Sequence, residues 1–341
     1  MPATSPSPTL LVVATGGTIG MRDTGAGLSP DPEFPAALDA MLAEVTARLG
    51  ARVRVNHLSP AIDSANADAD TAPRIARAVR ARIRTHRPRG VVITHGTDTL
   101  AHTAARLAFE LADEGAPVVV TGSQFPHTDP ASDATANLAL AASAALRANP
   151  QAPVAIAFGG ALLPAVRATK FDTDAREGFR AERPLGASAE GLGEVGPDAA
   201  RESDPPSPGR GSAAARVVSF RFVPGTTAAD LRATVAAKPD GLVLECTGAG
   251  NAPMAKPGMA DAIAEACAAL PVVAITQCAR GGVDLDRYAV GRELAAVGVM
   301  DGGDMTLEAA LAKLGFALDR GASGETLRRL IARNLVGERT P

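Results

Sequence analysis

The sequence predicts an α/β fold with two domains, a larger N-terminal one built on a parallel sheet and a smaller C-terminal one. Three observations predict it. Short apolar runs rich in β-branched residues recur, and each is followed by a stretch of helical period. Strands of this kind are typical of a parallel sheet covered on both faces. The length of 341 residues suits about two domains at roughly 150 residues each.

Five short apolar runs predict the strands of the N-terminal domain. After the third run, apolar residues from Leu100 to Leu111 fall at helical spacing, and Gly115 stands where that helix is expected to stop. The helix follows Asp98-Thr99, so it begins beside polar residues at the end of a strand. The predicted strands are residues 10–14, 53–57, 91–94, 118–121 and 154–158.

A linker is predicted between the two domains. The segment Asp204-Pro-Pro-Ser-Pro-Gly-Arg-Gly-Ser212 cannot hold a helix or a central strand. The expected organisation is a disordered tail over 1–9, an N-terminal domain over 10–178, a linker over 179–216 and a C-terminal domain over 217–341. In the last of these we expect strands at 217–222, 242–246 and 272–276, and helices near 287–296, 306–314 and 325–335.

The composition excludes several classes of protein. Against 37 Asp plus Glu there are 34 Lys plus Arg, and only 3% of the residues are aromatic, so nucleic-acid binding is not expected. The longest uncharged runs, 153–166 and 266–279, are shorter than the ~20 residues of a membrane helix. No signal-peptide core precedes the first strand. We therefore expect a cytoplasmic protein that does not enter a membrane.

The three cysteines predict neither a disulfide framework nor a zinc site. Cys246, Cys267 and Cys278 are an odd number and lack Cys-x-x-Cys spacing. We expect them to be reduced and buried, and no metal site is predicted.

Two glycine- and threonine-rich segments follow predicted strands, where ligands bind in open parallel sheets. In Thr15-Gly-Gly-Thr18-Ile-Gly20 the two adjacent glycines let the backbone turn tightly and approach a ligand, although a plain crossover turn explains them equally well. The spacing Gly-Gly-x-x-Gly does not fit the dinucleotide fingerprint Gly-x-Gly-x-x-Gly. In Thr94-His-Gly-Thr-Asp-Thr99, Asp98 is either a helix N-cap or a carboxylate that binds an ammonium group.

Three further positions are weaker candidates on their own. Asp63-Ser64 is explained by ordinary turn chemistry. Lys170 is either a solvated surface charge or, beside Asp98, a proton carrier. For His95 we expect a packed or hydrogen-bonded role rather than that of a base.

Taken in order along almost the whole chain, these motifs resemble the bacterial-type L-asparaginase family, which includes glutaminase-asparaginases. Thr-Gly-Gly-Thr-Ile near the start and His-Gly-Thr-Asp-Thr about 80 residues later carry the resemblance. The blocks look most like the intracellular type I branch. The supporting segments are Pro117-Val-Val-Val-Thr-Gly-Ser-Gln124, Ala168-Thr-Lys170, Gly248-Ala-Gly-Asn251, Thr276-Gln-Cys278 and Asp304-Met-Thr306-Leu-Glu-Ala309.

The resemblance implies a larger flavodoxin-like domain that holds the active site, and hydrolysis of a side-chain amide to a carboxylate and ammonia without a metal or organic cofactor. It implies a homodimer or homotetramer in which a flexible loop covers the site and the partner's smaller domain completes it. Thr18 would be the nucleophile, supported by Thr97, Asp98 and Lys170. The substrate L-asparagine would be bound by Asp63, Ser64, Gly17, Gly96, Thr97 and Asp98.

Two segments depart from the family pattern. The family has a tyrosine on the mobile loop, where this chain reads Gly27-Leu28-Ser29-Pro30, and the only tyrosine is Tyr288. Leu28 can exclude water but cannot share a proton, while Gly25 and Gly27 keep the freedom of a hinge. The segment around Asp284 and Asp286 does not reproduce the glutamate that secreted members supply to a partner's site. The preference between asparagine and glutamine stays open, since one methylene is worth only about 1–3 kcal/mol.

Three alternatives remain at this point. One is a catalytically inert homologue that binds an amino acid and acts as a regulator. Another is the glutaminase subunit of a tRNA-dependent amidotransferase, which has an extra N-terminal domain and needs a nucleic-acid-binding partner. The third is a dinucleotide-dependent oxidoreductase. The joint presence of Thr18, Asp98 and Lys170 favours the hydrolase.

Overall fold

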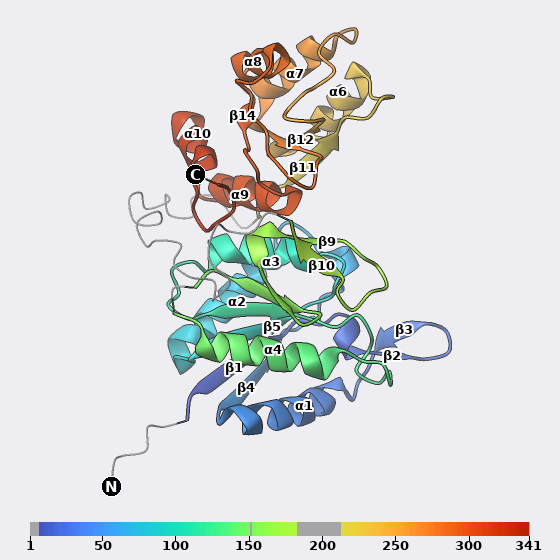
Figure 1. Ribbon diagram of the computed structural model, residues 1–341, viewed down its shortest axis with the longest axis vertical. Helices are drawn as coiled ribbons and strands as arrows, with labels where there is room; N and C mark the ends of the chain where they lie inside the picture. The colour runs from blue at the N-terminus through green and yellow to red at the C-terminus, as the bar shows by residue number, and fades with distance from the viewer. Residues whose placement is uncertain (1–6, 151, 183–212, 341) are drawn as a thin grey trace. The chain divides into compact units, whose positions relative to one another are not determined.

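The computed structural model describes residues 7–150, 152–182 and 213–340. These residues form two compact units, the first running to Ala181 and the second containing 213–340. Each unit has its own sheet of mainly parallel strands, flanked by helices (Figure 1). The predicted α/β fold is confirmed.

The sheet of the first unit has six strands in the order β4-β1-β5-β6-β7-β8. All neighbours are parallel except β8, which runs antiparallel to β7. Numbered along the chain, the five parallel strands have the flavodoxin-like order 2-1-3-4-5. Their bounds are β1 (Thr9–Ala14), β4 (Arg52–His57), β5 (Gly90–Thr94), β6 (Val118–Thr121), β7 (Ala155–Phe158) and β8 (Ala161–Pro164).

Helices cover both faces of this sheet, which explains why its central strands are apolar throughout. Leu10 and Val12 of β1 pack with Leu38 of α1 and Leu138 of α4 in one core cluster. The intervening residues of β1 are also buried and point to the opposite face, where α2 and α3 pack together (Figure 1). The helices are α1 (Phe34–Leu49), α2 (Thr71–His86), α3 (Leu100–Glu110) and α4 (Ala134–Arg147), with short 3₁₀ turns η1 (Thr18–Gly20), η2 (Ser64–Asn66) and η3 (Ala165–Arg167).

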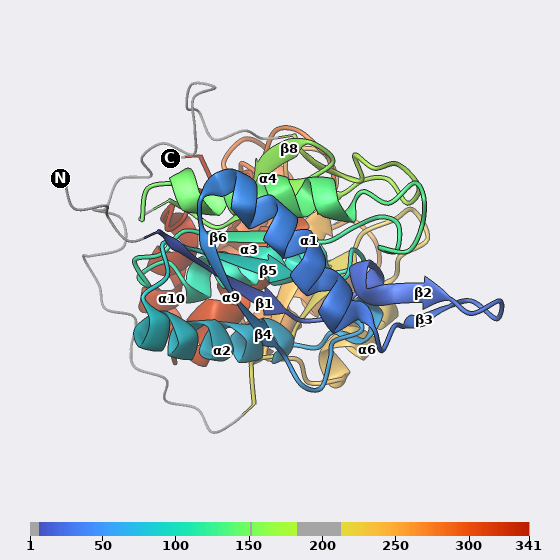
Figure 2. The same cartoon turned by 90° about the horizontal axis from the view of Figure 1, so that it is seen from below.

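Two small antiparallel hairpins extend the first unit. β2 (Met21–Asp23) pairs with β3 (Leu28–Pro30), and this hairpin projects away from the sheet (Figure 2). Gly25 and Gly27 form its turn with φ angles of 77° and 116°, a region that favours glycine. The segment expected to be a loop is therefore an ordered hairpin. β9 (Ala168–Lys170) pairs with β10 (Phe179–Ala181).

The second unit has a four-stranded parallel sheet in the order β11-β12-β13-β14. Leu242 and Leu244 of β12 pack with Leu231 of α6 and Met259 of α7 in its core. Helix α6 begins with a capping box between Thr227 and Asp230. The elements are β11 (Val217–Arg221), α6 (Ala228–Ala236), β12 (Gly241–Cys246), α7 (Met259–Ala269), β13 (Val272–Thr276), α8 (Ala289–Ala296), β14 (Met300–Asp301), α9 (Leu307–Asp319) and α10 (Gly324–Ala332).

The structure differs from the sequence-based expectations at some boundaries. Thr9, the end of the predicted tail, is the first residue of β1 because it pairs with Arg52. Phe179–Ala181, the start of the predicted linker, form β10. Helix α3 ends at Glu110, and Gly115 instead takes its φ of 64° in the bend that follows. Residues 1–6 of the predicted tail and 183–212 of the predicted linker lie outside the described residues.

None of the helices in the described residues combines the length and the apolar character that crossing a membrane requires. In the same ranges, no three His, Cys, Asp or Glu side chains gather in a way that could hold a metal ion. All three cysteines are free thiols. Burial raises the pKa of Cys246 to about 12, whereas Cys278 is exposed, contrary to the expectation that all three are buried.

Candidate active site

The carboxyl ends of β1 and β5 mark the point where the strand order of the first unit reverses. The chain leaves β1 toward β4 and leaves β5 toward β6 on the other side. Loops that diverge in this way leave a crevice, which is where ligands bind in open α/β sheets. The loops in question are the two glycine- and threonine-rich segments, one following Ala14 and one following Thr94.

Glycines let these two loops touch backbone to backbone. A Cβ atom on Gly17, whose φ is 94°, would lie 2.3 Å from the Gly96 nitrogen. A Cβ atom on Gly96 would in turn lie 2.4 Å from the Ser64 hydroxyl oxygen. No side chain fits at either contact, because real Cβ atoms do not approach other atoms so closely. Three loops therefore meet at one point, and they bring Thr18, Ser64 and Thr97 into the same neighbourhood.

Hydrogen bonds fix the three loops to one another. The Thr15 hydroxyl donates to the Thr94 carbonyl at 2.6 Å. The Ile62 N–H donates to the Thr15 carbonyl at 2.6 Å, and the Thr99 hydroxyl donates to the Ser64 carbonyl at 2.8 Å. The arrangement is thus held by buried or half-buried polar contacts rather than by one flexible segment.

Lys170 connects a distant part of the chain to this crevice. Its Nζ donates to the Thr97 hydroxyl and to Asp98 Oδ1, both at 2.9 Å. Pairing of Lys170 with Phe179 in the β9–β10 hairpin holds the lysine backbone. The Lys170 side chain is 22% exposed and the Asp98 side chain 59%. The carboxylate therefore keeps a face open to a ligand while the ammonium group is largely enclosed.

The structure argues against the helix-cap interpretation of Asp98. Helix α3 begins at Leu100, its N-cap residue is Thr99, and no side-chain hydrogen bond caps it. The Asp98 carboxylate instead accepts a hydrogen bond from Lys170. Its position is explained by the lysine and not by the helix end.

His95 is a packed residue, as expected. It is 1% exposed, and its Nδ1 donates to the Gly96 carbonyl at 2.8 Å. Burial lowers its pKa, which the hydrogen bond to Gly96 offsets in part. The imidazole is enclosed and hydrogen-bonded within its own loop, which is the environment of a packed residue.

Asp63 and Ser64 have different environments although they are neighbours. Asp63 caps the short turn η2, where its carboxylate accepts hydrogen bonds from the Ala65 N–H at 3.1 Å and the Asn66 side chain at 2.7 Å. Ser64 is 4% exposed and lies against Gly96. The turn chemistry expected for Asp63 is present, and Ser64 is the residue of the pair that lies at the meeting point of the loops.

Sequence reasoning did not single out Asp133, which organises the loop between β6 and α4. Asp133 accepts hydrogen bonds from the Gln124 and Phe125 N–H groups at 3.0 and 3.1 Å. Gln124 donates through Nε2 to the Thr173 carbonyl, shortly after Lys170. The only sequence signal was an aspartate in front of a helix, which reads as an N-cap. Asp133 is the N-cap residue of α4, but its side chain caps no backbone N–H of the helix; it accepts from the loop and from the Asn137 side chain at 2.8 Å.

Comparisons with known proteins match the same family in both units of the chain. Residues 9–195 match the family model "Asparaginase, N-terminal", and residues 216–331 match "Glutaminase/Asparaginase C-terminal domain". The L-asparaginase of Thermococcus kodakarensis is 36% identical, covering 97% of this chain and 99% of its own. L-asparaginase 1 of Escherichia coli K12 is 32% identical, with coverage of 97% and 98%. The crystal structure of L-asparaginase I from Vibrio cholerae superposes with a TM-score of 0.79 at 28% identity, over 98% of this chain and all of that one.

Proposed function

The chain belongs to the asparaginase family and is an amide hydrolase, and from this premise we propose that it hydrolyses L-asparagine to L-aspartate and ammonia with Thr18 as the nucleophile. The observation that carries the proposal is the bridge from Lys170 to Thr97 and Asp98, at the loop whose Gly96 packs against Gly17. A nucleophile, a lysine that can carry a proton and a carboxylate, gathered at the carboxyl ends of neighbouring strands, suit amide hydrolysis through a covalent intermediate.

In the first step the Thr18 hydroxyl oxygen attacks the amide carbon. Its proton passes to Lys170, which acts in the neutral form with Thr97 beside it, and then to the leaving nitrogen. The C–N bond breaks, ammonia leaves, and an ester of Thr18 remains. Backbone N–H groups of the Gly17-Thr18 turn and of Thr97 are the candidates to stabilise the oxyanion that forms on attack.

In the second step water attacks the ester carbon. Lys170 takes a proton from the water and returns one to the Thr18 oxygen as the C–O bond breaks. The products are L-aspartate and the original enzyme. The reaction therefore consumes one amide and one water and needs no further reactant.

For substrate binding we propose that the open face of Asp98 pairs with the α-ammonium group. Ser64 and the backbone at Asp63 would hold the α-carboxylate, with Gly17, Gly96 and Thr97 lining the crevice. The close approach of Gly96 to Ser64 supports a shared binding surface. Asp98, 59% exposed, is available to a ligand while bound to Lys170.

The hairpin next to Thr18 lacks the tyrosine that the family resemblance leads one to expect. Leu28 stands in its place on β3 and is 51% exposed. A leucine has no proton to share, so in this chain activation of Thr18 falls to Lys170 and Thr97. Its apolar side chain suits a cover that excludes water.

We further propose a cytoplasmic homodimer or homotetramer, with the partner subunit completing the site. Free thiols at Cys246, Cys267 and Cys278 suit a reducing compartment. Light scattering on the protein as it elutes from a size-exclusion column would give the mass of the oligomer.

The alternatives have less support. The glutamyl-tRNA(Gln) amidotransferase subunits D of Aeropyrum pernix and Methanopyrus kandleri match over 61% and 75% of their own lengths, whereas the L-asparaginases of Thermococcus kodakarensis and Escherichia coli K12 match over 99% and 98% of theirs. An inert amino-acid-binding homologue has no need for a lysine bonded to both Thr97 and Asp98. Release of ammonia from L-asparagine, L-glutamine and both D-isomers tests the proposal. No release from any of them would favour the inert homologue.

Asp98→Asn is expected to lower kcat/KM by about 10²-fold or more and to raise KM. The amide loses the charge that pairs with the substrate ammonium, and it also loses the charge that orients Lys170, whose Nζ is 2.9 Å away. Steady-state ammonia release at several L-asparagine concentrations gives both constants.

A matched control is Asp113→Asn, an exposed carboxylate beyond the opposite end of α3. It should leave both constants unchanged. If Asp98→Asn lowered only the melting temperature and left the kinetics intact, Asp98 would have a structural role and the proposal for it would be wrong.

A further inference from the structure

The β2–β3 hairpin begins and ends beside the proposed nucleophile. The turn Thr18–Gly20 leads directly into β2, and Asp31 follows β3. The Asp31 N–H donates to the Gly20 carbonyl at 2.9 Å, which closes the base of the hairpin. Any movement at this base is therefore transmitted to the backbone next to Thr18.

A side chain from a distant loop contacts both ends of this base. His127, in the loop between β6 and α4, donates from Nδ1 to the Ile19 carbonyl at 3.0 Å. Its Nε2 lies 3.4 Å from Asp31 Oδ2. The two side chains are enclosed, His127 being 9% exposed and Asp31 5%. One imidazole thus spans the start and the end of the hairpin.

Both neighbours of the ring are hydrogen-bond acceptors. The Ile19 carbonyl faces Nδ1 and the Asp31 carboxylate faces Nε2. Asp31 is itself held, because Oδ1 accepts from the Glu33 N–H at 3.0 Å and lies 3.7 Å from Arg22 of β2. The Phe34 ring packs on the imidazole with centroids 5.3 Å apart. Three contacts, with Ile19, Asp31 and Phe34, therefore hold the His127 ring.

We propose that His127 is a positioning residue for the reaction, acting through the Ile19 carbonyl on Thr18 and through Asp31 on the hairpin. The proposal rests on the proposed function, in which Thr18 is the nucleophile. On one side of Thr18 the chain is fixed where Gly17 meets Gly96. On the other side it is fixed by His127 at Ile19. Thr18 thus lies between two fixed residues, Gly17 and Ile19. Loss of the contact at either one would change the direction in which the Thr18 hydroxyl points.

Two substitutions of His127 separate its two contacts. Asn carries its amide nitrogen near the position of Nδ1, so His127→Asn keeps a donor for the Ile19 carbonyl and loses the contact with the Asp31 carboxylate. Gln carries its amide nitrogen near the position of Nε2, so His127→Gln keeps a donor for the Asp31 carboxylate and loses the hydrogen bond to the Ile19 carbonyl. Both side chains are polar and no larger than histidine, which favours a folded protein. His86→Asn, at the last residue of α2, is the control.

In His127→Gln we expect kcat to fall about 10- to 100-fold with KM within about twofold, because a small displacement of a reacting group lowers the rate more than the binding. The kcat of His127→Asn should be much closer to that of the native protein, because this variant keeps the donor to the Ile19 carbonyl. Hydrogen exchange at the amides of residues 20–31 should be faster in His127→Asn than in the native protein, because the hairpin base has lost its Asp31 contact.

Unchanged kcat in both variants would overturn the proposal while leaving the proposed function intact. It would also be overturned by equal losses in both variants that only follow a lower melting temperature. If the native protein released no ammonia from L-asparagine, the proposed function would fail instead. The exchange rates at residues 20–31 would then decide by themselves whether His127 holds the hairpin.

Discussion

Thr18→Ala is expected to lower ammonia release from L-asparagine by at least about 10³-fold, because the proposed covalent intermediate forms on the Thr18 hydroxyl. The fold should be unaffected. Thr18 is half-buried in the turn after β1, and alanine keeps the Cβ that the turn accommodates. The measurement is ammonia release under saturating L-asparagine, with the thermal unfolding of both proteins recorded beside it.

Thr24→Ala is the matched control for this prediction. Thr24 lies in the turn of the same hairpin, where its hydroxyl donates to the Gly27 carbonyl at 2.8 Å and is exposed. Loss of that hydroxyl should leave turnover within about twofold of native. If Thr18→Ala kept more than a few per cent of native activity while Thr24→Ala behaved as expected, Thr18 would not be the nucleophile.

The parallel sheets could be predicted from the sequence because their strands are buried on both faces. Residues such as Val91, Val92 and Ile93 are apolar in succession, and β6 has the predicted bounds. The β2–β3 hairpin could not be predicted, since Met-Arg-Asp and Leu-Ser-Pro carry no alternating pattern. Its ladder and the bond from Asp31 to Gly20 are local, but its base also contacts His127, which lies about a hundred residues away in sequence.

The candidate site could be predicted only in part, and for a similar reason. Gly17 and Gly96 stand out in the sequence because glycines at strand ends signal close backbone approach, and the structure has them in contact. Lys170 gives no such signal. Its contacts with Thr97 and Asp98 join residues 73 and 72 positions apart. From the residues alone a solvated surface charge was the usual interpretation of Lys170, and the family resemblance favoured the site. Asp133 was missed because it accepts mainly from backbone N–H groups of its own loop, which no motif records. His127 was missed because the Ile19 carbonyl and Asp31 lie about a hundred residues away.

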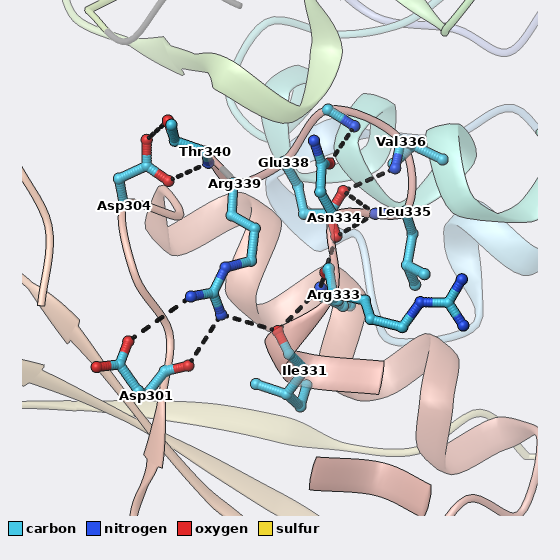
Figure 3. A network of polar contacts seen from close by, with 12 residues as sticks. Asp301, Asp304, Ile331, Arg333, Asn334, Leu335, Val336, Glu338, Arg339 and Thr340 are labelled. Atoms are coloured by element: carbon cyan, nitrogen blue, oxygen red, sulfur yellow. Dashed lines mark hydrogen bonds and ion pairs between the residues drawn. The ribbon is translucent and has the colours of Figure 1, made fainter. Parts of the chain in front are cut away.

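A buried ion pair holds the C-terminal segment of the second unit. Lys313 of α9 and Glu338 are both 0% exposed, with Nζ and Oε1 2.5 Å apart. Nζ also donates to the Ile331 and Arg333 carbonyls, so all three of its protons are used. Glu338 accepts from the Leu335 N–H at 2.9 Å and the Val336 N–H at 2.7 Å. Figure 3 shows this segment folded around Glu338, with Arg339 and Thr340 reaching Asp301 and Asp304.

Glu338→Gln is expected to lower the free energy of unfolding of the second unit by about 3–5 kcal/mol at pH 7, because it leaves a buried ammonium without its counter-charge. Glutamine keeps the size of the side chain and one acceptor, so the change isolates the charge. Urea titration followed by tyrosine fluorescence measures it directly. Tyr288 is the only tyrosine, there is no tryptophan, and Tyr288 belongs to the second unit.

The decrease in the free energy of unfolding caused by Glu338→Gln should be largest near pH 7 and smaller near pH 9. Burial lowers the pKa of Lys313 from 10.5 to about 8, although the Glu338 carboxylate raises it in part. The attraction needs a charged lysine, so it is present below about pH 8 and is lost as the pH rises through that value. Glu265→Gln is the control, because the Arg232–Glu265 pair is exposed. Its loss should lower the free energy of unfolding by less than about 1 kcal/mol. A loss for Glu338→Gln as small as that of the control, or one equal at both pH values, would show that the carboxylate charge does not hold this segment.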